Sequence, residues 1–374
     1  MGSIPISNIV KRLSPRLIGL VVSMAAATLA AETVSPGTPL QAPEINPVKA
    51  ELGKRLFYDA RLSGDTSTAC ASCHQPEHGF SHPDALSPGY RGNGHFRNSP
   101  TLINAALKKI WMHDGRLGTN LNDVTREMIT ETYLMNMDMR LMQERLKQDP
   151  VYVQMFKDAY GAEPSNGLVR KAIPEFLKTL VSRNSDFDKG TLSASAERGF
   201  ELFKGKGGCA QCHSGPLFSD GQAHNTGVPE NFDVFLEPER YQAFLAYNKF
   251  MGNENIMNIK RDLGAHVQSH KADGSDIGKF MTPALRELTY TAPYMHNGTL
   301  KSLPEVVAFY NAGGGEDARK SGLLEPLGLS VREQNDLVNF LESLSGDPLN
   351  GADFVPENKE YSYQPITDWR KTAN

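Results

Sequence analysis

Apolar residues recur at helical spacing along much of the chain from about residue 45 onward. Residues 167–190 place five apolar side chains on a single helical face: Val169, Ile173, Phe176, Leu177 and Leu180. Pro174 lies within this stretch and predicts a bend in the helix. The hydrophobic pattern of this region therefore indicates an amphipathic helix.

A second helix is marked by its start signal. Ser330 and Glu333 have the spacing of a capping box, and an apolar stripe follows them up to Gly346. Further helices are predicted at residues 47–58, 119–147, 195–205 and 303–312. No convincing run of alternating strand residues appears. The pattern therefore predicts an all-α fold.

The N-terminal region, residues 1–31, has the features of a secretory signal peptide. Basic residues between positions 11 and 16 precede the apolar run "LIGLVVSMAAATLA", and small residues follow at Ala30 and Ala31. The apolar run is too short to span a bilayer. We expect cleavage near Ala30 or Ala31, with an uncleaved anchor as the alternative. The mature protein is then periplasmic and not embedded in the membrane.

Length and charge limit the classes of protein further. A chain of 374 residues is long enough for two domains, and 39% hydrophobic with 22% charged residues argues against wholesale disorder. The net charge of −4 gives no reason to expect a nucleic-acid partner. We therefore expect a folded, exported protein.

The four cysteines of the chain stand in two CxxCH motifs, "CASCH" and "CAQCH". Outside the cytosol, paired cysteines can form disulfides or a redox pair, and four of them can bind zinc. None of these alternatives explains why a histidine follows each pair directly. Covalent c-type haem does, because the thiols form thioethers and the histidine ligates iron. The sequence therefore predicts two haem c groups on these residues: Cys70, Cys73, His74, Cys209, Cys212 and His213.

The two motifs belong to two copies of one longer unit. An E-x-G-x-x-L-F segment begins at Glu51 and again at Glu197, ahead of each motif. Downstream, "SPTLINAALKKIWMHDGRL" is similar to "TPALRELTYTAPYMHNGTL". An internal repeat therefore predicts two domains and an irregular tail, at residues 45–190, 191–346 and 347–374.

With these motifs the sequence resembles the bacterial diheme cytochrome c peroxidases and the MauG-type proteins of the same superfamily. The likeness rests on both CxxCH motifs and on "RNSPTLINAA", "HDGR", "HNTGVP" and "APYMHNG", and it covers about residues 45–345. It implies two cytochrome c-like domains, each wrapping one covalently attached haem. His74 would be the proximal ligand of a peroxide-reacting haem and His213 that of an electron-transfer haem.

The resemblance also implies a calcium ion between the two haems. Asn98, Thr291 and Pro293 match positions that supply calcium oxygens, the last two through their backbone carbonyls. Neutral oxygen ligands completed by water suit such a hard cation. The alternative is that Asn98 fixes a turn and that Thr291 and Pro293 shape a loop.

One departure from the peroxidases concerns the second haem. They usually carry a methionine ligand fourteen residues after the histidine of "HNG", and here that position is Tyr310. MauG-type proteins also have tyrosine there. A phenolate ligand would stabilise ferric and higher oxidation states, whereas a thioether favours ferrous iron. The alternative is a core aromatic on the helix at 303–312.

A second departure concerns the route between the haems. The family generally has a tryptophan directly before Asp-Gly-Arg as an electron relay, and here His113 occupies that position. Trp111 lies two residues upstream. It is therefore either a relay in a shifted position or a core residue.

The resemblance also implies a glutamate in the distal pocket of the first haem, after "DGR", where a carboxylate can move a proton between the peroxide oxygens. By register the family's glutamate falls on Tyr133, and Glu127 and Glu131 are the nearby substitutes. Solvated surface positions are the alternative for both glutamates.

His95 is a candidate distal ligand, and His224 is expected to form a hydrogen bond near the second haem.

These features together predict a periplasmic diheme oxidoreductase that reacts with hydrogen peroxide. In one version a small cytochrome c or cupredoxin supplies the electrons for peroxide reduction. In the MauG-like version peroxide is used to oxidise a partner protein, and Tyr310 favours this version. The alternative is a diheme electron-transfer cytochrome without peroxidase activity.

Overall fold

A computed structural model of the chain describes residues 34–90, 93–118 and 120–349. The predicted signal peptide, residues 1–31, and the tail from residue 350 onward lie outside the described residues. Among the helices of the described part, none combines the length and the apolar character needed to cross a membrane.

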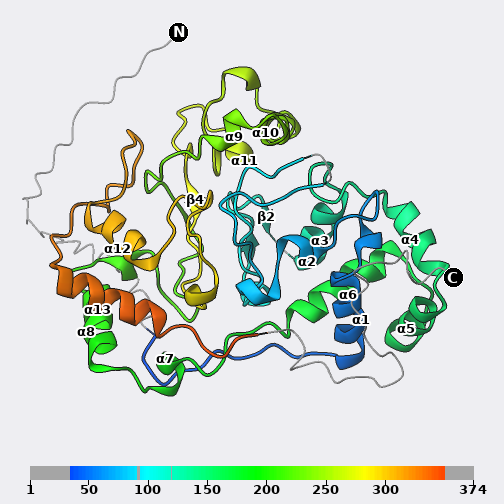
Figure 1. Cartoon of the computed structure of the whole chain (residues 1–374), viewed down its shortest axis with the longest axis horizontal. Coiled ribbons are helices and arrows are strands. Elements are labelled where there is room, and N and C mark those ends of the chain that lie inside the picture. Colours follow the sequence, from blue (N-terminus) through cyan, green and yellow to red (C-terminus); the bar gives the residue numbers. More distant parts are fainter. Residues whose placement is uncertain (1–33, 91–92, 119, 350–374) are drawn as a thin grey trace, which may run out of the picture. The chain divides into compact units, whose positions relative to one another are not determined.

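The described chain is helix-rich with few strands, as the hydrophobic pattern predicted (Figure 1). The helices of the N-terminal half are α1 (Pro47–Phe57), α2 (Cys70–Cys73), α3 (Leu121–Thr130), α4 (Met139–Lys147), α5 (Pro150–Tyr160) and α6 (Asn166–Leu177). Those of the C-terminal half are α7 (Asp186–Lys189), α8 (Ala194–Lys204), α9 (Asp233–Leu236), α10 (Pro238–Phe250), α11 (His266–Ser269), α12 (Leu303–Asn311) and α13 (Val331–Glu342).

The strands are short and form two antiparallel pairs. They are β1 (Ile110–Trp111) with β2 (Leu117–Gly118), and β3 (Ala223–His224) with β4 (Phe280–Met281). Short 3₁₀ helices connect the longer elements: η1 (Ala60–Leu62), η2 (Pro76–His78), η3 (Ala105–Leu107), η4 (Cys209–Gln211), η5 (Ile256–Asn258) and η6 (Leu288–Tyr290).

Helix starts follow the local sequence signals. The predicted capping box of α13 is confirmed, because the Glu333 amide donates to the Ser330 hydroxyl and the Ser330 amide donates to the Glu333 carboxylate at 2.8 Å. The start of α1 is fixed by Asn46, whose side chain accepts from the amide of Lys49.

The single helix predicted at residues 119–147 is wrong. Helix α3 ends at Thr130, and α4 begins only at Met139, where the Asp138 side chain caps the new helix. Ile129 and Met142 are both fully buried, so the apolar stripe continues across the break. Hydrophobic periodicity alone therefore could not reveal that the chain turns here.

Helices α5 and α10 were not predicted, nor were the four-residue helices α2, α9 and α11. The face of α10 that packs inward includes Phe244 and Tyr247, yet Phe250 on the same helix is 66% exposed. Apolar residues thus lie on all sides of α10 and do not form the one-sided stripe on which the prediction depends.

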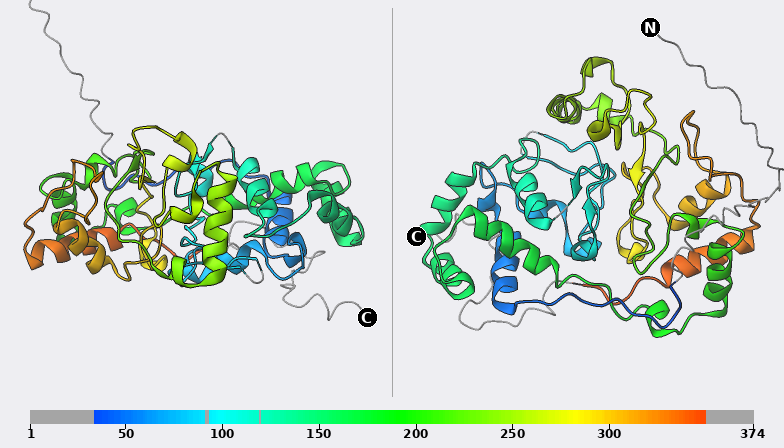
Figure 2. Two further views of the ribbon diagram at one scale, coloured as in Figure 1. Left: turned by 90° about the horizontal axis from the view of Figure 1, so that it is seen from above. Right: turned by 180° about the vertical axis from the view of Figure 1, so that it is seen from behind.

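Two pairs of helices pack closely in the same manner: α1 with α6, and α8 with α13 (Figures 1 and 2). Each contact is centred on a glycine. A Cβ atom on Gly53 would lie 2.0 Å from the carbonyl oxygen of Ala172, and one on Gly199 would lie 2.0 Å from that of Asp336. Only glycine allows the two backbones to approach so closely.

The halves also share unusual backbone conformations at corresponding positions. Three pairs of non-glycine residues have positive φ angles: Phe80 and Phe218, Asn104 and Glu287, Met112 and Met295. A 3₁₀ helix follows the second pair in each half, η3 after Asn104 and η6 after Glu287. The likeness between the halves therefore extends from sequence motifs to local geometry.

Candidate haem-binding site

Each CxxCH motif forms one tight turn on the edge of a hydrophobic core. In the first motif the amide of His74 donates to the carbonyl of Cys70 at 3.0 Å, and in the second the amide of His213 donates to that of Cys209 at 2.9 Å. Cys70 packs against the core around α1 and α6, and Cys209 against the core around α8 and α13. Each motif is therefore anchored to its own core.

The two motif histidines are oriented in the same way. The Nδ1 atom of His74 lies 3.1 Å from the carbonyl oxygen of Phe80, and that of His213 lies 2.8 Å from the carbonyl oxygen of Phe218. A carbonyl can only accept, so Nδ1 carries the hydrogen and Nε2 keeps its lone pair. Burial lowers the pKa of His74 to about 4 and also lowers that of His213. Both imidazoles are therefore neutral and prepared to ligate iron.

The cysteines also fit thioether attachment better than the alternatives. Burial raises the pKa of the Cys70 thiol to about 12 and that of the Cys73 thiol to about 11. Reactive redox thiols have lowered pKa values. Among the described residues, one group of three potential metal ligands lies close together, and it includes only one cysteine, Cys212. The cysteines of the two motifs therefore do not come together as a four-cysteine zinc site.

Tyr310 lies on α12 close to the second motif. Its pKa is raised to about 12, and the largest cause is burial. A hydrogen bond to Thr226 lowers the pKa, whereas the nearby Cys209 and Cys212 raise it. Tyr310 therefore lies near enough to the second CxxCH motif for the motif cysteines to affect its pKa, and its role as a ligand of that haem stays a prediction.

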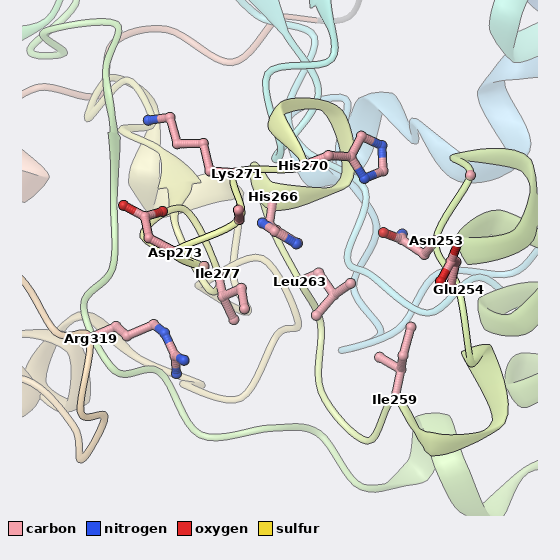
Figure 3. A pocket seen from close by; sticks show the side chains of 13 residues that line it. Asn253, Glu254, Ile259, Leu263, His266, His270, Lys271, Asp273, Ile277 and Arg319 are labelled. Atoms are coloured by element: carbon pink, nitrogen blue, oxygen red, sulfur yellow. The ribbon is translucent and has the colours of Figure 1, made fainter.

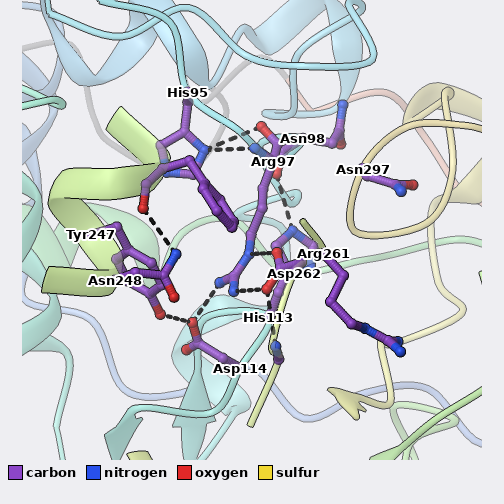
Figure 4. A network of polar contacts seen from close by, with 12 residues as sticks. His95, Arg97, Asn98, His113, Asp114, Tyr247, Asn248, Arg261, Asp262 and Asn297 are labelled. Atoms are coloured by element: carbon purple, nitrogen blue, oxygen red, sulfur yellow. Dashed lines mark hydrogen bonds and ion pairs between the residues drawn. The ribbon is translucent and has the colours of Figure 1, made fainter. Parts of the chain in front are cut away.

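A buried network of charged residues lies near the predicted relay position (Figure 4). Arg97 donates through Nε to Asp262 at 2.6 Å and through Nη1 to Asp114 at 2.5 Å. Asp114 also accepts from Arg116 at 3.0 Å and from the hydroxyl of Tyr247. Burial opposes ionisation of Asp262, but the charge of Arg97 outweighs it and holds the pKa of Asp262 below its usual value. The network joins segments of both halves.

Histidines occupy the place where a relay tryptophan was expected. His113 lies 6.4 Å from His296 between ring centroids, and His296 stacks on Phe280 at 3.6 Å. The Nε2 atom of His296 is buried and has no hydrogen-bond partner among the described residues. Trp111 lies in strand β1 and instead donates through Nε1 to the carbonyl of Ala105 at 2.9 Å. Trp111 is therefore fixed by a contact outside this histidine group.

The distal candidates lie around the end of α3. Glu131 is its C-terminal cap, and burial together with the neighbouring Glu127 raises its pKa. An oxygen of Glu127 lies 3.8 Å from Nε of Arg116. Tyr133 is buried, with its ring centroid 5.8 Å from that of His95. Both predicted glutamates are thus held by specific neighbours and are not freely solvated.

The segment that contains Asn98 is hydrogen-bonded to the segment that runs from Thr291 through Pro293 to His296. Asn98 is buried, donates its side-chain amide to the carbonyl of Asp84 at 2.8 Å, and donates its backbone amide to the carbonyl of His296 at 2.8 Å. Thr291 is also buried, in the segment that leads through Pro293 to His296. The described contacts thus join Asn98 to the end of the predicted segment.

A cavity of about 590 Å³ lies elsewhere, between the segment after α10 and the segment around α11 (Figure 3). Basic side chains such as His266 and Arg319 line it together with the acidic Glu254 and Asp273. It contains none of the predicted site residues. Because both charges line it, the cavity does not define one class of ligand.

Helical cores that each anchor a CxxCH motif, with the motif histidine fixed through Nδ1, define the class of c-type haem proteins. The family model for di-haem cytochrome c peroxidase matches residues 47–196. Cytochrome-c peroxidase IdrP2 of Denitromonas iodatirespirans is 51% identical over 308 residues, which are 80% of this chain and 82% of that protein.

Two further proteins agree with this result. Methylamine utilization protein MauG of Methylorubrum extorquens is 36% identical over 312 residues, covering 81% of this chain and 80% of its own. The crystal structure of a MauG-like protein associated with microbial copper homeostasis superposes with a TM-score of 0.70 at 25% identity, covering 86% of this chain and 95% of that one.

The chain belongs to the di-haem cytochrome c peroxidase family. It is a peroxidase-type oxidoreductase, and its family implies two haem c groups. Hydrogen peroxide and either an electron donor or a protein substrate are the partners that the family implies.

Some residues of the site were not singled out from the sequence. Arg97 and Asp262 are separated by 165 positions, so nothing in the local sequence connects them. The pairing of Asp220 with His224 was also missed, although an acid four residues before a histidine is a visible signal.

Proposed function

We propose that the chain is a periplasmic diheme enzyme made of two cytochrome c-like domains, residues 45–190 and 191–346, that arose by internal duplication. The matched helix contacts at Gly53 and Gly199 support this proposal. The positive φ angles at corresponding residues of the two halves support it as well. In this proposal each domain wraps one haem, and residues 1–31 direct export.

Cys70 and Cys73 would attach the first haem and Cys209 and Cys212 the second, with His74 and His213 as iron ligands. The observation that carries this assignment is the shared Nδ1-to-carbonyl contact, which leaves both Nε2 atoms available. When bound, haem iron supplies one-electron redox chemistry and reactivity toward peroxide. The residues of the chain provide orientation, proton transfer and electrostatics.

The distal side would be built from residues around α3. Glu131, whose pKa is raised by burial and by Glu127, would accept a proton from one peroxide oxygen and return it to the other. Arg116 would provide positive charge beside it, paired with Glu127. His113, whose Nε2 lies 3.0 Å from the carbonyl oxygen of Asn98, and Trp111 in β1 would influence electron transfer between the haems.

Two versions of the reaction have separate support. The relative at 51% identity is a named cytochrome-c peroxidase, which favours peroxide reduction with electrons from a small cytochrome c or cupredoxin. Tyr310 beside the second motif favours the MauG-like version, in which peroxide is used to oxidise a partner protein. Both versions need an open first haem.

The haem content and reactivity provide the direct test. We expect a pyridine haemochrome assay to return two haems per chain, and one haem after replacement of both Cys209 and Cys212 by Ala, because each motif attaches its own haem. We expect cyanide or peroxide to change the spectrum of one haem only. A single haem in the parent protein would contradict the assignment. Two haems that both ignore added ligands would indicate an electron-transfer cytochrome.

We also propose a calcium ion held by Asn98, Thr291 and Pro293. The burial of Asn98 and Thr291 and the neutral character of their oxygens support it. Exhaustive chelation should release one calcium per chain, measured by elemental analysis, and should change the haem spectra or turnover reversibly. Asn98→Ala should lower the calcium content. If the untreated protein contains no calcium, this proposal is wrong.

A further inference from the structure

Three side chains meet beside the second haem-attachment motif: Cys212, Asp220 and His224. One ligand atom of each lies within 4.8 Å of the others. Nε2 of His224 lies 2.8 Å from an oxygen of Asp220, and the amide of Asp220 donates to the carbonyl of Cys212 at 2.8 Å. His224 also lies in β3, which pairs with β4, so the backbone holds this imidazole in position.

Haem attachment changes what this group can do. Once the Cys212 sulfur is a thioether it carries no charge and no hydrogen, so the three residues no longer offer the donor set of a metal site. The sulfur keeps its lone pairs and can still accept a weak hydrogen bond. What remains is an imidazole, fixed by a carboxylate, next to a sulfur atom that is covalently joined to the porphyrin edge.

The first motif has the opposite arrangement around its second cysteine. The sulfur of Cys73 lies 3.5 Å from the carbonyl oxygen of Pro88. A carbonyl oxygen presents negative partial charge, whereas an imidazole N–H presents positive partial charge. Negative charge near a haem disfavours its reduced state, and positive charge favours it. Beside Cys73 the nearby polar group is therefore a carbonyl, whereas beside Cys212 the imidazole of His224 offsets the negative charge of the Asp220 carboxylate.

We propose that His224, held by Asp220, is a positioning residue that raises the midpoint potential of the second haem from its place within 4.8 Å of the Cys212 sulfur, where it offsets the charge of Asp220. This inference rests on the proposed haem attachment at Cys209 and Cys212. It goes beyond that proposal because it assigns a potential-setting role to residues that touch neither iron nor peroxide. It also opposes Tyr310, whose phenolate lowers the potential of the same haem.

The test is a redox titration of the haem-loaded protein, followed by visible absorption, with both haems resolved. His224→Phe and His224→Leu both remove the N–H groups but differ in shape. Each should shift the potential of the second haem to a more negative value and leave that of the first haem unchanged. His224→Gln keeps an N–H donor and should shift the potential less than either.

His270→Phe is the matched control, because His270 is exposed and belongs to neither motif. It should leave both potentials unchanged. Unchanged potentials in His224→Phe and His224→Leu would overturn the inference, as would equal shifts of both haems. Loss of the second haem from both variants would assign His224 a structural role and would also overturn it. The haem count of the parent protein, measured first, tells this failure apart from failure of the attachment proposal.

Discussion

Tyr310→Phe is expected to remove a ligand from the second haem iron while leaving the fold intact. The substitution deletes only the hydroxyl of a partly buried ring on α12, so the packing of that helix is kept. A phenolate ligand stabilises ferric iron, and its loss should therefore raise the midpoint potential of this haem and change its ferric absorption spectrum. Absorption spectroscopy and a redox titration of the haem-loaded variant measure both effects.

Tyr294→Phe is the matched control, because Tyr294 is another partly buried tyrosine of the same half. Its hydroxyl donates to the backbone carbonyl of Leu288 at 2.8 Å, so it is engaged in a hydrogen bond within the protein. This control should lose a hydrogen bond but keep the spectrum and the potential of the parent. If Tyr310→Phe behaves in the same way, Tyr310 is a core aromatic. Peroxide reduction with an external electron donor would then be the better supported version of the function.

Helices with a one-sided apolar face could be predicted because their signal is local. The helices at 47–58, 195–205 and 303–312 were found within a residue or two of α1, α8 and α12. Helix α10 was missed because its apolar side chains lie on all sides of it. The break between α3 and α4 was missed because the apolar spacing continues from one helix into the next. Tertiary packing decides both cases.

The haem-attachment residues could be predicted for the same reason. Two cysteines and a histidine within five positions must lie close together in any fold, so the motif alone carries the chemistry. The contact of His74 with Phe80 adds the orientation, which the motif does not specify. The calcium ligands and the distal acid stay predictions, because they depend on how distant loops meet.

The most stabilising polar group of the described chain is expected to be Arg97, which could not be found from the sequence. Its side chain is 3% exposed and pairs with Asp114 and Asp262, which are 0% and 8% exposed. Arg97→Met leaves two buried carboxylates without their main positive partner. Breaking a buried ion pair in this way costs about 3–5 kcal/mol. Urea unfolding of the haem-loaded variant, followed by circular dichroism, should show a loss of this size at neutral pH.

The effect should depend on pH with a definite sign. Arg97 holds the pKa values of Asp114 and Asp262 below the usual range, so its contribution is complete above the pKa of an unfolded aspartate, about 3.9. That contribution is lost as the pH falls through the folded pKa values. In Arg97→Met, Asp262 is buried without a guanidinium and Asp114 keeps only Arg116, so both pKa values rise relative to the parent and the variant regains stability as acid protonates the carboxylates. The difference from the parent should therefore be largest near neutral pH and should shrink on acidification.

Arg140→Met is the control for this prediction. Arg140 also pairs with an aspartate, Asp138, but the two side chains are 91% and 52% exposed. An exposed pair of this kind contributes little to stability, because water screens it at every pH. The two variants thus remove the same side chain from a buried network and from the surface. Equal losses of stability in both, or a loss in Arg97→Met that does not change with pH, would show that the network does not hold the folded chain together in the way its geometry indicates.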